Sequence, residues 1–280
     1  MSYLQELSRS RELLTNLTLR DIRGQYKRTI FGQLWSLLNP LAAMLVYTIV
    51  FRLILRVAPP PGDPSGLDVF PLWLLCALLP WNFFSGAVTT GMGSLLSNAG
   101  LVQKVYFTRI VLPISSIGAV AFNWLFEMGV LVVALLIVGG WHVLVFLPLV
   151  VVFMAILAVF ASGIALMLSV ANVHFRDTQY LMGIVFQIWM YLTPIVYPVA
   201  TTIQQQPLFN RPLFGTNITL FNIYTLNPME RFSMVFRNLM YDQKLPGLTD
   251  SLFCLVAAII SLLVGFWVFR KNEKGLAEAL

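Results

Sequence analysis

Long runs of apolar residues, nearly free of charge, alternate along this chain with short polar segments. The longest run extends over residues 110–175 and carries one formally charged side chain, Glu127. A helix needs about 20 mostly apolar residues to cross a bilayer, so this run can hold two crossings and a turn. The Gly139-Gly140 pair lies where that turn is expected. The pattern predicts an all-α membrane protein.

The remaining charge-poor runs, divided by the length of one crossing, give six predicted transmembrane helices in a single domain. The polar residues 1–33 precede the first span, and we expect them to form a cytoplasmic amphipathic segment. Residues 200–249 mix aromatic with polar residues and are too many for a turn, which favours short re-entrant or interfacial helices on the outer side. The spans are expected at about residues 34–55, 69–91, 112–138, 143–170, 179–199 and 250–269.

Composition supports a membrane location. Hydrophobic residues make up 58% of the 280 residues, charged residues make up 11%, and the mean hydropathy is +0.80. Soluble domains are about one quarter charged. In such a protein the net charge of +6 is a signal of topology before it is a sign of nucleic-acid binding. Cys76 and Cys254 fall in apolar runs, so we expect buried free thiols rather than a disulfide or a metal pair.

Basic residues gather before the first predicted span, after the last one, and in the loops after the second and the fourth. Lysine and arginine are enriched in short cytoplasmic loops, so both termini are expected in the cytoplasm. This orientation requires an even number of crossings, as six is. Residues 1–33 lack the apolar core of a cleavable signal peptide, and we expect the first span to act as an uncleaved insertion signal.

The basic N-terminal segment has the periodicity of an amphipathic helix on the inner membrane surface. One reading is a topology anchor that touches anionic lipid. The other is a helix that contacts a cytoplasmic partner or guides an anionic substrate. The apolar face is formed by Leu19, Ile22, Tyr26 and Ile30, and the basic face largely by Arg20, Arg23, Lys27 and Arg28.

The loop at residues 94–110 is apolar but interrupted by Lys104 and Arg109. It predicts a short helix at the cytoplasmic surface with exposed apolar side chains. A plain connector needs only a few polar residues, whereas an exposed apolar patch favours contact with a partner protein.

Glu127 is an ionisable group inside a predicted span. An unpaired charge at that depth costs several kcal/mol, so Glu127 should face protein or water. One interpretation is a structural hydrogen bond to another helix, with Asn123 as a possible neighbour one turn earlier. The other is proton coupling or contact with a substrate.

Aromatic residues and prolines gather in the second and fifth predicted spans. Aromatic residues near span ends usually form interfacial belts. Facing a pore, they would offer the stacking surfaces that sugar rings favour, and the pattern alone leaves both readings open. The candidate pore aromatics, which include two from the first span, are Tyr47, Phe51, Trp73, Trp81, Trp189, Tyr191 and Tyr197.

The sequence offers little for an enzyme. It contains no G-x-x-x-x-G-K-[ST], H-E-x-x-H or G-x-S-x-G motif and no cysteine cluster. His174 and Asp177, in the loop after the fourth span, could suggest acid–base chemistry. Helix capping and local ion pairing are the favoured roles for this pair.

Several stretches together resemble the membrane subunit of an ABC-2 type exporter, of the branch that moves lipid-linked polysaccharides such as O-antigen, capsule, teichoic acid or galactan. Residues 19–35 with 38–40 are similar to that family's basic approach to the first span, and residues 100–107 with 112–113 to its coupling-helix loop. Residues 172–177 are similar to its loop before span five. Residues 191–198 and 226–228 are similar to its outer end of span five and its outer helices.

The resemblance implies a homodimer of this chain in the bacterial cytoplasmic membrane, with two copies of a separate cytoplasmic ATPase. This chain would then be a non-catalytic subunit without a cofactor, with ATP and Mg in the partner. The pore would follow the dimer axis between spans one, two and five, with the outer helices as a gate. Tyr26, Lys27 and Arg28 would contact the headgroup of a polyprenyl-pyrophosphate-linked glycan. The residues that would couple to the ATPase are Gln103, Lys104, Val105, Tyr106 and Phe107.

Two other functions remain open at this stage. An ABC-2 exporter of drugs or other lipids would share the topology without needing a wide, aromatic-lined pore. An ion-coupled secondary carrier would use Glu127 and no ATPase, but such carriers usually show internal repeats, which this sequence does not.

Overall fold

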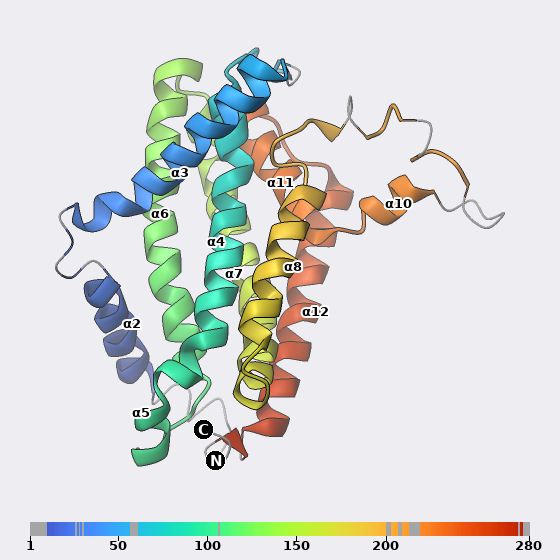
Figure 1. The fold of residues 1–280 in the computed structure, drawn as a ribbon. Coiled ribbons are helices and arrows are strands. Elements are labelled where there is room, and N and C mark those ends of the chain that lie inside the picture. The colour runs from blue at the N-terminus through green and yellow to red at the C-terminus, as the bar shows by residue number, and fades with distance from the viewer. Residues whose placement is uncertain are drawn as a thin grey trace.

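A computed structural model describes residues 10–25, 27, 29, 31–56, 61–105, 107–199, 203–206, 209–212, 219–273 and 275–276. The model is 79% helix, and no strand occurs in the described ranges. Long helices stand side by side as a bundle, with shorter helices at its two ends (Figure 1). The all-α prediction is confirmed.

Within the described residues, five helices are long and apolar enough to cross a membrane. Each lies over one of the predicted spans, and two of them extend beyond it by a turn or more. They are α3 with its π-helical continuation η2 (Trp35–Tyr47 and Thr48–Ile54), α4 (Phe70–Ser97), α6 (Val111–Gly139), α7 (Val143–His174) and α12 (Leu248–Asn272).

The remaining predicted span, residues 179–199, is not confirmed as a full crossing. Its helix, α8 (Thr178–Leu192), has 15 residues. That length corresponds to about 22 Å, short of the roughly 30 Å of a hydrocarbon core. Pro194 explains the end of the helix, because a proline disfavours helical geometry in the residue before it, and Thr193 is extended.

α4 lies at the centre of the bundle. It packs against α6 and α7, while α12 covers the other side of α7. Its side chains are buried in nearly every direction, as expected for a helix that is apolar all round. α3 is the opposite case, because most of its apolar surface is exposed and it leans across the bundle in Figure 1.

Short helices occupy the two ends of the bundle. At one end lie α2 (Arg11–Gln25) and α5 (Ala99–Lys104), together with the last turn of α12. A separate apolar cluster holds this end together, and we call it the inner-end cluster. Its buried members are Leu17, Leu95, Val102, Ile110, Val111, Leu112, Leu166, Val170, Val173, Phe269 and Leu276.

The predicted outer segment contains α10 (Leu220–Tyr224), α11 (Pro228–Phe236) and the π-helix η3 (Arg237–Asp242). Asn227 caps α11, because its side chain accepts a hydrogen bond from Met229 N at 3.0 Å. The same amide accepts from Trp189 Nε1 at 2.8 Å and donates to Thr193 Oγ1 at 3.1 Å. The cap of α11 therefore also joins the end of α8 to the outer helices.

Candidate functional site

A polar pocket of about 550 Å³ opens between α2, α4 and α6 at the end that carries α5. An apolar bundle rarely holds so many polar side chains in one place, and this concentration makes the pocket the candidate site. Its polar lining consists of Arg20, Asp21, Gln25, Thr90, Ser97, Asn98 and Ser116.

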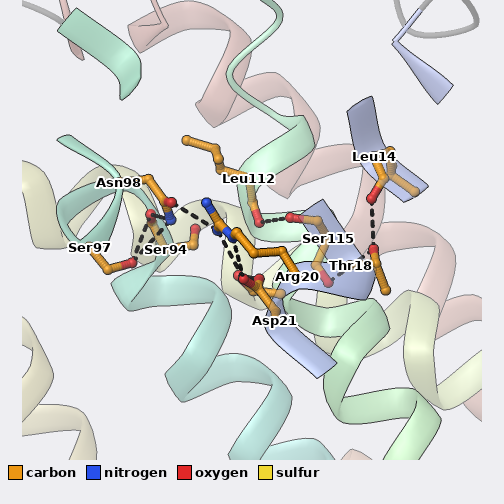
Figure 2. Close-up of polar contacts among 10 residues, drawn as sticks. Leu14, Thr18, Arg20, Asp21, Ser94, Ser97, Asn98, Leu112 and Ser115 are labelled. Carbon is orange, nitrogen blue, oxygen red and sulfur yellow. Dashed lines mark hydrogen bonds and ion pairs between the residues drawn. The ribbon is translucent and has the colours of Figure 1, made fainter. Parts of the chain in front are cut away.

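The wall formed by α2 is attached to α6 by small and polar residues. Thr18 Oγ1 contacts Ser115 O at 3.4 Å and donates to Leu14 O at 2.8 Å (Figure 2). A Cβ at Gly118 would lie 3.3 Å from Thr18 Cγ2, so a glycine permits this close approach. Half-buried and buried polar groups thus fix α2 against the bundle.

Asn123 belongs to this attachment rather than to a pair with Glu127. Its Nδ2 donates to Gln25 Oε1 at 2.6 Å. Glu127 instead faces an apolar cavity of about 300 Å³ between α3, α4 and α6. Among the described residues, Glu127 has no hydrogen-bond or ion-pair partner.

Arg20 connects α2 to the junction of α4 and α5. Its Nε and Nη2 donate to Asp21 Oδ1 at 3.0 and 2.9 Å, and Nη2 also donates to Asn98 Oδ1 at 2.9 Å (Figure 2). Asn98 Nδ2 in turn donates to Ser94 O at 2.8 Å. The sequence placed Arg20 on the basic face of the N-terminal helix but did not point to Asp21 or Asn98 as its partners. Arg20 and Asn98 are 78 positions apart in the chain, so their contact could not be predicted from local patterns.

The predicted headgroup residues follow directly after α2. Lys27 lies exposed in a turn two residues beyond Gln25, which lines the pocket. Tyr26 and Arg28 lie outside the described residues. Their predicted contact with a headgroup therefore stays a prediction.

The predicted coupling residues divide into two groups. Gln103, Lys104 and Val105 are exposed, and Val105 keeps 51% of its surface accessible. Phe107 is half-buried and packs against the inner-end cluster. Tyr106 lies outside the described residues. α5 thus presents one free face, while Val102 on its other side is buried.

The segment after α5 is held by the C-terminal end of the chain. Arg109 N donates to Glu273 Oε1 at 3.2 Å, and the guanidinium of Arg109 donates to the backbone carbonyl of Glu273. Leu276 is buried in the inner-end cluster beside these groups. The segment that contains α5 is therefore connected to α2 through Asn98, at its start, and to the end of α12 through Arg109, after its last residue.

The candidate pore aromatics do not form one exposed surface. Trp73 and Trp81 are 5% and 3% exposed, so their rings face the interior of the chain rather than an open channel. Trp81 packs edge-on against Trp189 with ring centroids 6.1 Å apart. Burial of large apolar rings in the central helix accounts for this difference from the expected pore positions.

The other candidates are accessible at least in part, and they lie on α3, η2 and around α8. Tyr47 packs near Phe51 and its hydroxyl contacts Met190 Sδ at 3.9 Å. Tyr197 Oη donates to Tyr191 O at 2.9 Å, which fixes the turn after α8. Contact with sugars stays a prediction for Tyr47, Phe51, Trp189, Tyr191 and Tyr197.

His174 does not pair with Asp177. Its Nδ1 contacts Val170 O at 2.9 Å, one turn back in the same helix. Asp177 lies at the N-cap position of α8, but its side chain makes no capping hydrogen bond there, so neither the expected cap nor an acid–base pair is formed. Among the described residues there is also no group of three or more histidine, cysteine, aspartate or glutamate residues that could hold a metal ion.

Comparison with known proteins gives the family. Residues 12–206 match the model of the ABC-2 type transporter family. The O-antigen export system permease protein RfbA of Myxococcus xanthus is 28% identical over 280 residues, which cover 99% of this chain and 98% of that protein. The protein of the same name from Klebsiella pneumoniae is 27% identical, over 96% of this chain and 95% of its own length.

A third relative is similar over a smaller part of this chain. The polysialic acid transport protein KpsM of Escherichia coli is 30% identical over 188 residues, which cover 65% of this chain and 69% of that protein. The family match covers more than half of the chain, and five helices in the part that the structure describes are suited to crossing a bilayer. This chain therefore belongs to the ABC-2 type transporter family, as a multi-pass protein of the bacterial cytoplasmic membrane.

Proposed function

We propose that this chain is the channel-forming permease of an ATP-driven exporter that moves a lipid-linked polysaccharide across the cytoplasmic membrane. The observation that carries the proposal is the end-to-end similarity to proteins named O-antigen export system permeases, which covers 99% of this chain in one case. A polymer of sugars cannot cross hydrocarbon unaided, so the exporter must supply a continuous polar or aromatic path.

The proposed topology has six crossings with both termini in the cytoplasm. α2 and the end of α12 lie at the same end of the bundle, where Leu17 and Leu276 share one cluster. A chain that starts and finishes on the same side crosses an even number of times. With five long helices in the described part of the chain, α8 and the residues after it supply the sixth crossing in this proposal.

The proposed partners are a second copy of this chain and two copies of a cytoplasmic ABC ATPase. The exposed face of α5, at Gln103, Lys104 and Val105, is the docking surface for the ATPase. ATP and Mg are bound and consumed in that partner. This chain contributes no catalytic group and needs no cofactor, and it exchanges no contacts with nucleic acid in this scheme.

The proposed access route for the substrate is the polar pocket beneath α2. A pyrophosphate group carries negative charge, and Arg20 and Lys27 are the described cations on this side of α2 that face the pocket or follow it directly. Tyr26 and Arg28 are the neighbours of Lys27 in the sequence. The polyprenyl tail stays in the bilayer while the headgroup enters between α2 and α4.

The proposed pore lies on the dimer axis. α3 and α8 carry broad apolar faces that a single chain leaves exposed, and Tyr47, Phe51, Trp189, Tyr191 and Tyr197 belong to or border these helices. Two copies facing one another would place these rings around a shared channel. Stacking on aromatic rings suits sugars of many kinds.

A second candidate function is the export of small amphiphiles. The apolar cavity of about 300 Å³ beside Glu127 is large enough for part of such a molecule. The two functions differ in what stimulates the ATPase.

The test is reconstitution of this chain with its ATPase in proteoliposomes. ATP hydrolysis is measured with added polyprenyl-pyrophosphate-linked glycan and, separately, with small amphiphilic compounds. Stimulation by the glycan alone supports the proposed function. Stimulation by the amphiphiles but not by the glycan would replace it with the second candidate.

A further inference from the structure

Helices α4 and α5 meet at a single residue, Asn98. It ends α4 and begins α5, with φ −113° and ψ 24°, outside helical geometry. Any change in the angle between α4 and α5 therefore requires a change in the backbone dihedral angles of this residue. A side chain that restrains Asn98 also restrains α5.

The side chain of Asn98 is held from both of its polar ends. Its Oδ1 accepts the hydrogen bond from Arg20 Nη2 at 2.9 Å, and its Nδ2 donates to Ser94 O at 2.8 Å (Figure 2). The second bond is local and stays within one turn of α4. The first bond alone reaches another helix, since Arg20 belongs to α2.

α2 is itself fixed to the start of α6. Thr18 contacts Ser115, Asp21 Oδ2 accepts from Ser116 Oγ at 3.5 Å, and Gln25 accepts from Asn123. These contacts lie along one side of the helix. Arg20 is therefore anchored to a helix that cannot follow α5 freely, and its bond to Asn98 resists movement of α5.

Arg20 also faces the polar pocket, where Asn98 lies beside it. Its side chain is 51% exposed, so an incoming group can reach the guanidinium. The acceptor that it binds on Asn98 is a neutral amide oxygen. A phosphate oxygen carries negative charge and makes a stronger bond to a guanidinium than a neutral acceptor does. An anion in the pocket thus competes with Asn98 for Arg20.

We propose that the Arg20–Asn98 hydrogen bond is a latch that restrains α5, and that the anionic headgroup of the substrate opens it by taking Arg20 from Asn98. The identity of the anion rests on the proposed function above. Arg20 is here a positioning residue for ATP hydrolysis, because it acts on the partner only through α5. By linkage, ATPase states that tilt α5 also release Arg20 and favour anion binding.

Two substitutions of the same residue separate the latch from a merely structural role. Both Asn98→Asp and Asn98→Leu remove the donor to Ser94, so they are matched in that loss. Asn98→Asp keeps an acceptor for Arg20 and adds a charge, which strengthens the latch. Asn98→Leu removes the acceptor and leaves α5 unrestrained.

The experiment measures basal ATP hydrolysis by the full complex in proteoliposomes, without substrate. Asn98→Leu is expected to raise the basal rate by about 2- to 12-fold, the equilibrium equivalent of one net hydrogen bond. Asn98→Asp is expected to lower it. Equal shifts in the same direction, or no shift in either variant, would overturn the latch.

A cycle with Arg20→Gln supplies the second readout. If the two residues act only through their shared hydrogen bond, the double variant Arg20→Gln with Asn98→Leu has the same basal rate of ATP hydrolysis as either single variant. Additive effects would contradict the proposal. Arg23→Gln, which removes an exposed cation from the same helix, is the control for lost charge and should behave as the unaltered complex.

Spin labels at the exposed positions Asn16 on α2 and Gly100 on α5 report the geometry directly. A broader distance distribution in Asn98→Leu, and a narrower one in Asn98→Asp, is expected; identical distributions would argue against the latch. These substrate-free readouts separate the two proposals. If lipid-linked glycan fails to stimulate hydrolysis while the Asn98 variants still diverge, the proposed substrate is wrong and the latch remains.

Discussion

Arg237 joins several segments at the end of the bundle that carries α11 and η3. It is 4% exposed, and its guanidinium lies 3.6 Å from the ring centroid of Trp73. Nη1 and Nη2 donate to the carbonyls of Pro194 and Ile195 at 2.5 and 2.7 Å. Because α8 ends at Leu192, these carbonyls have left the helical ladder, and a buried carbonyl needs a donor. Arg237 supplies it.

Replacing Arg237 by methionine should therefore destabilise the protein. The side chain keeps a similar length but leaves buried carbonyls unpaired, at a cost of about 1–3 kcal/mol for each group. The expected result is a lower unfolding temperature in detergent, with unfolding monitored by tryptophan fluorescence. Arg237→Lys should lose less, because an ammonium still donates. An unfolding temperature equal to that of the exposed control Arg23→Met would contradict the role of Arg237.

Single residues of this kind were beyond the reach of sequence reasoning. Arg237 counted only as one basic residue of a long outer segment, and its acceptors lie 42 and 43 positions away. The same is true of Arg20 and Asn98. The cap at Asn227 was predictable, because a capping residue and the helix it begins are adjacent in the chain. Contacts between neighbours in the chain could be predicted from the sequence, whereas contacts between distant segments became apparent only in the folded structure.

At the scale of helices, α7 and α12 come together through small residues. A Cβ placed on Gly163 would overlap the backbone of Ser261, and a Cβ placed on Gly265 would overlap the backbone of Gly163. Ser261 Oγ adds a hydrogen bond to Phe160 O at 2.9 Å. In a bilayer, close approach of this kind replaces the hydrophobic effect as the force between helices.

Gly163→Ala should consequently push α12 away from α7. Overpacking of a close contact costs about 1–3 kcal/mol. A smaller folded fraction after solubilisation, measured by size-exclusion chromatography, is the expected result. Gly129→Ala in α6 is the matched control, since a Cβ there meets no atom within 4 Å. Similar yields for the two variants would show that the α7–α12 contact tolerates a methyl group.

Helix α5 permits a separate prediction about the proposed ATPase. Val105 is exposed, so Val105→Ala should weaken coupling between substrate and ATP hydrolysis without lowering the unfolding temperature. Phe107→Ala should affect both, because Phe107 packs against the inner-end cluster. Stimulated hydrolysis and thermal unfolding, measured on the same preparations, distinguish the two. Unchanged stimulation in Val105→Ala would remove this face from the docking surface.

The long helices were predictable from the length of apolar runs, since a bilayer demands a minimum span. The end of α8 was harder to predict from the sequence. Pro194 stood inside an apolar run that was long enough for a crossing, and length alone did not reveal that the helix would stop at Leu192. The central place of α4 was also hidden, because a helix that faces lipid and one that faces other helices have nearly the same composition in a membrane.

The topology of the whole molecule depends on whether the chain crosses the bilayer between Arg176 and Leu245. Both residues are exposed, and Arg176 lies before α8 while Leu245 lies after η3. Six crossings place them on opposite sides of the membrane. If α8 and the outer helices only dip into the bilayer and return, the two residues lie on the same side, and the chain crosses five times.

Single cysteines decide between these topologies. In a background with Cys76 and Cys254, both buried, replaced by alanine, Leu245→Cys and Trp141→Cys should react with a membrane-impermeant maleimide in spheroplasts. Arg176→Cys and Asn16→Cys should react only after permeabilisation. Labelling of Arg176→Cys and Leu245→Cys under the same condition would establish a re-entrant α8. An odd number of crossings would then put α2 and the end of α12 on opposite sides, in conflict with their shared cluster of Leu17 and Leu276. The packing of the two ends therefore favours the proposed sixth crossing through α8 and the residues after it.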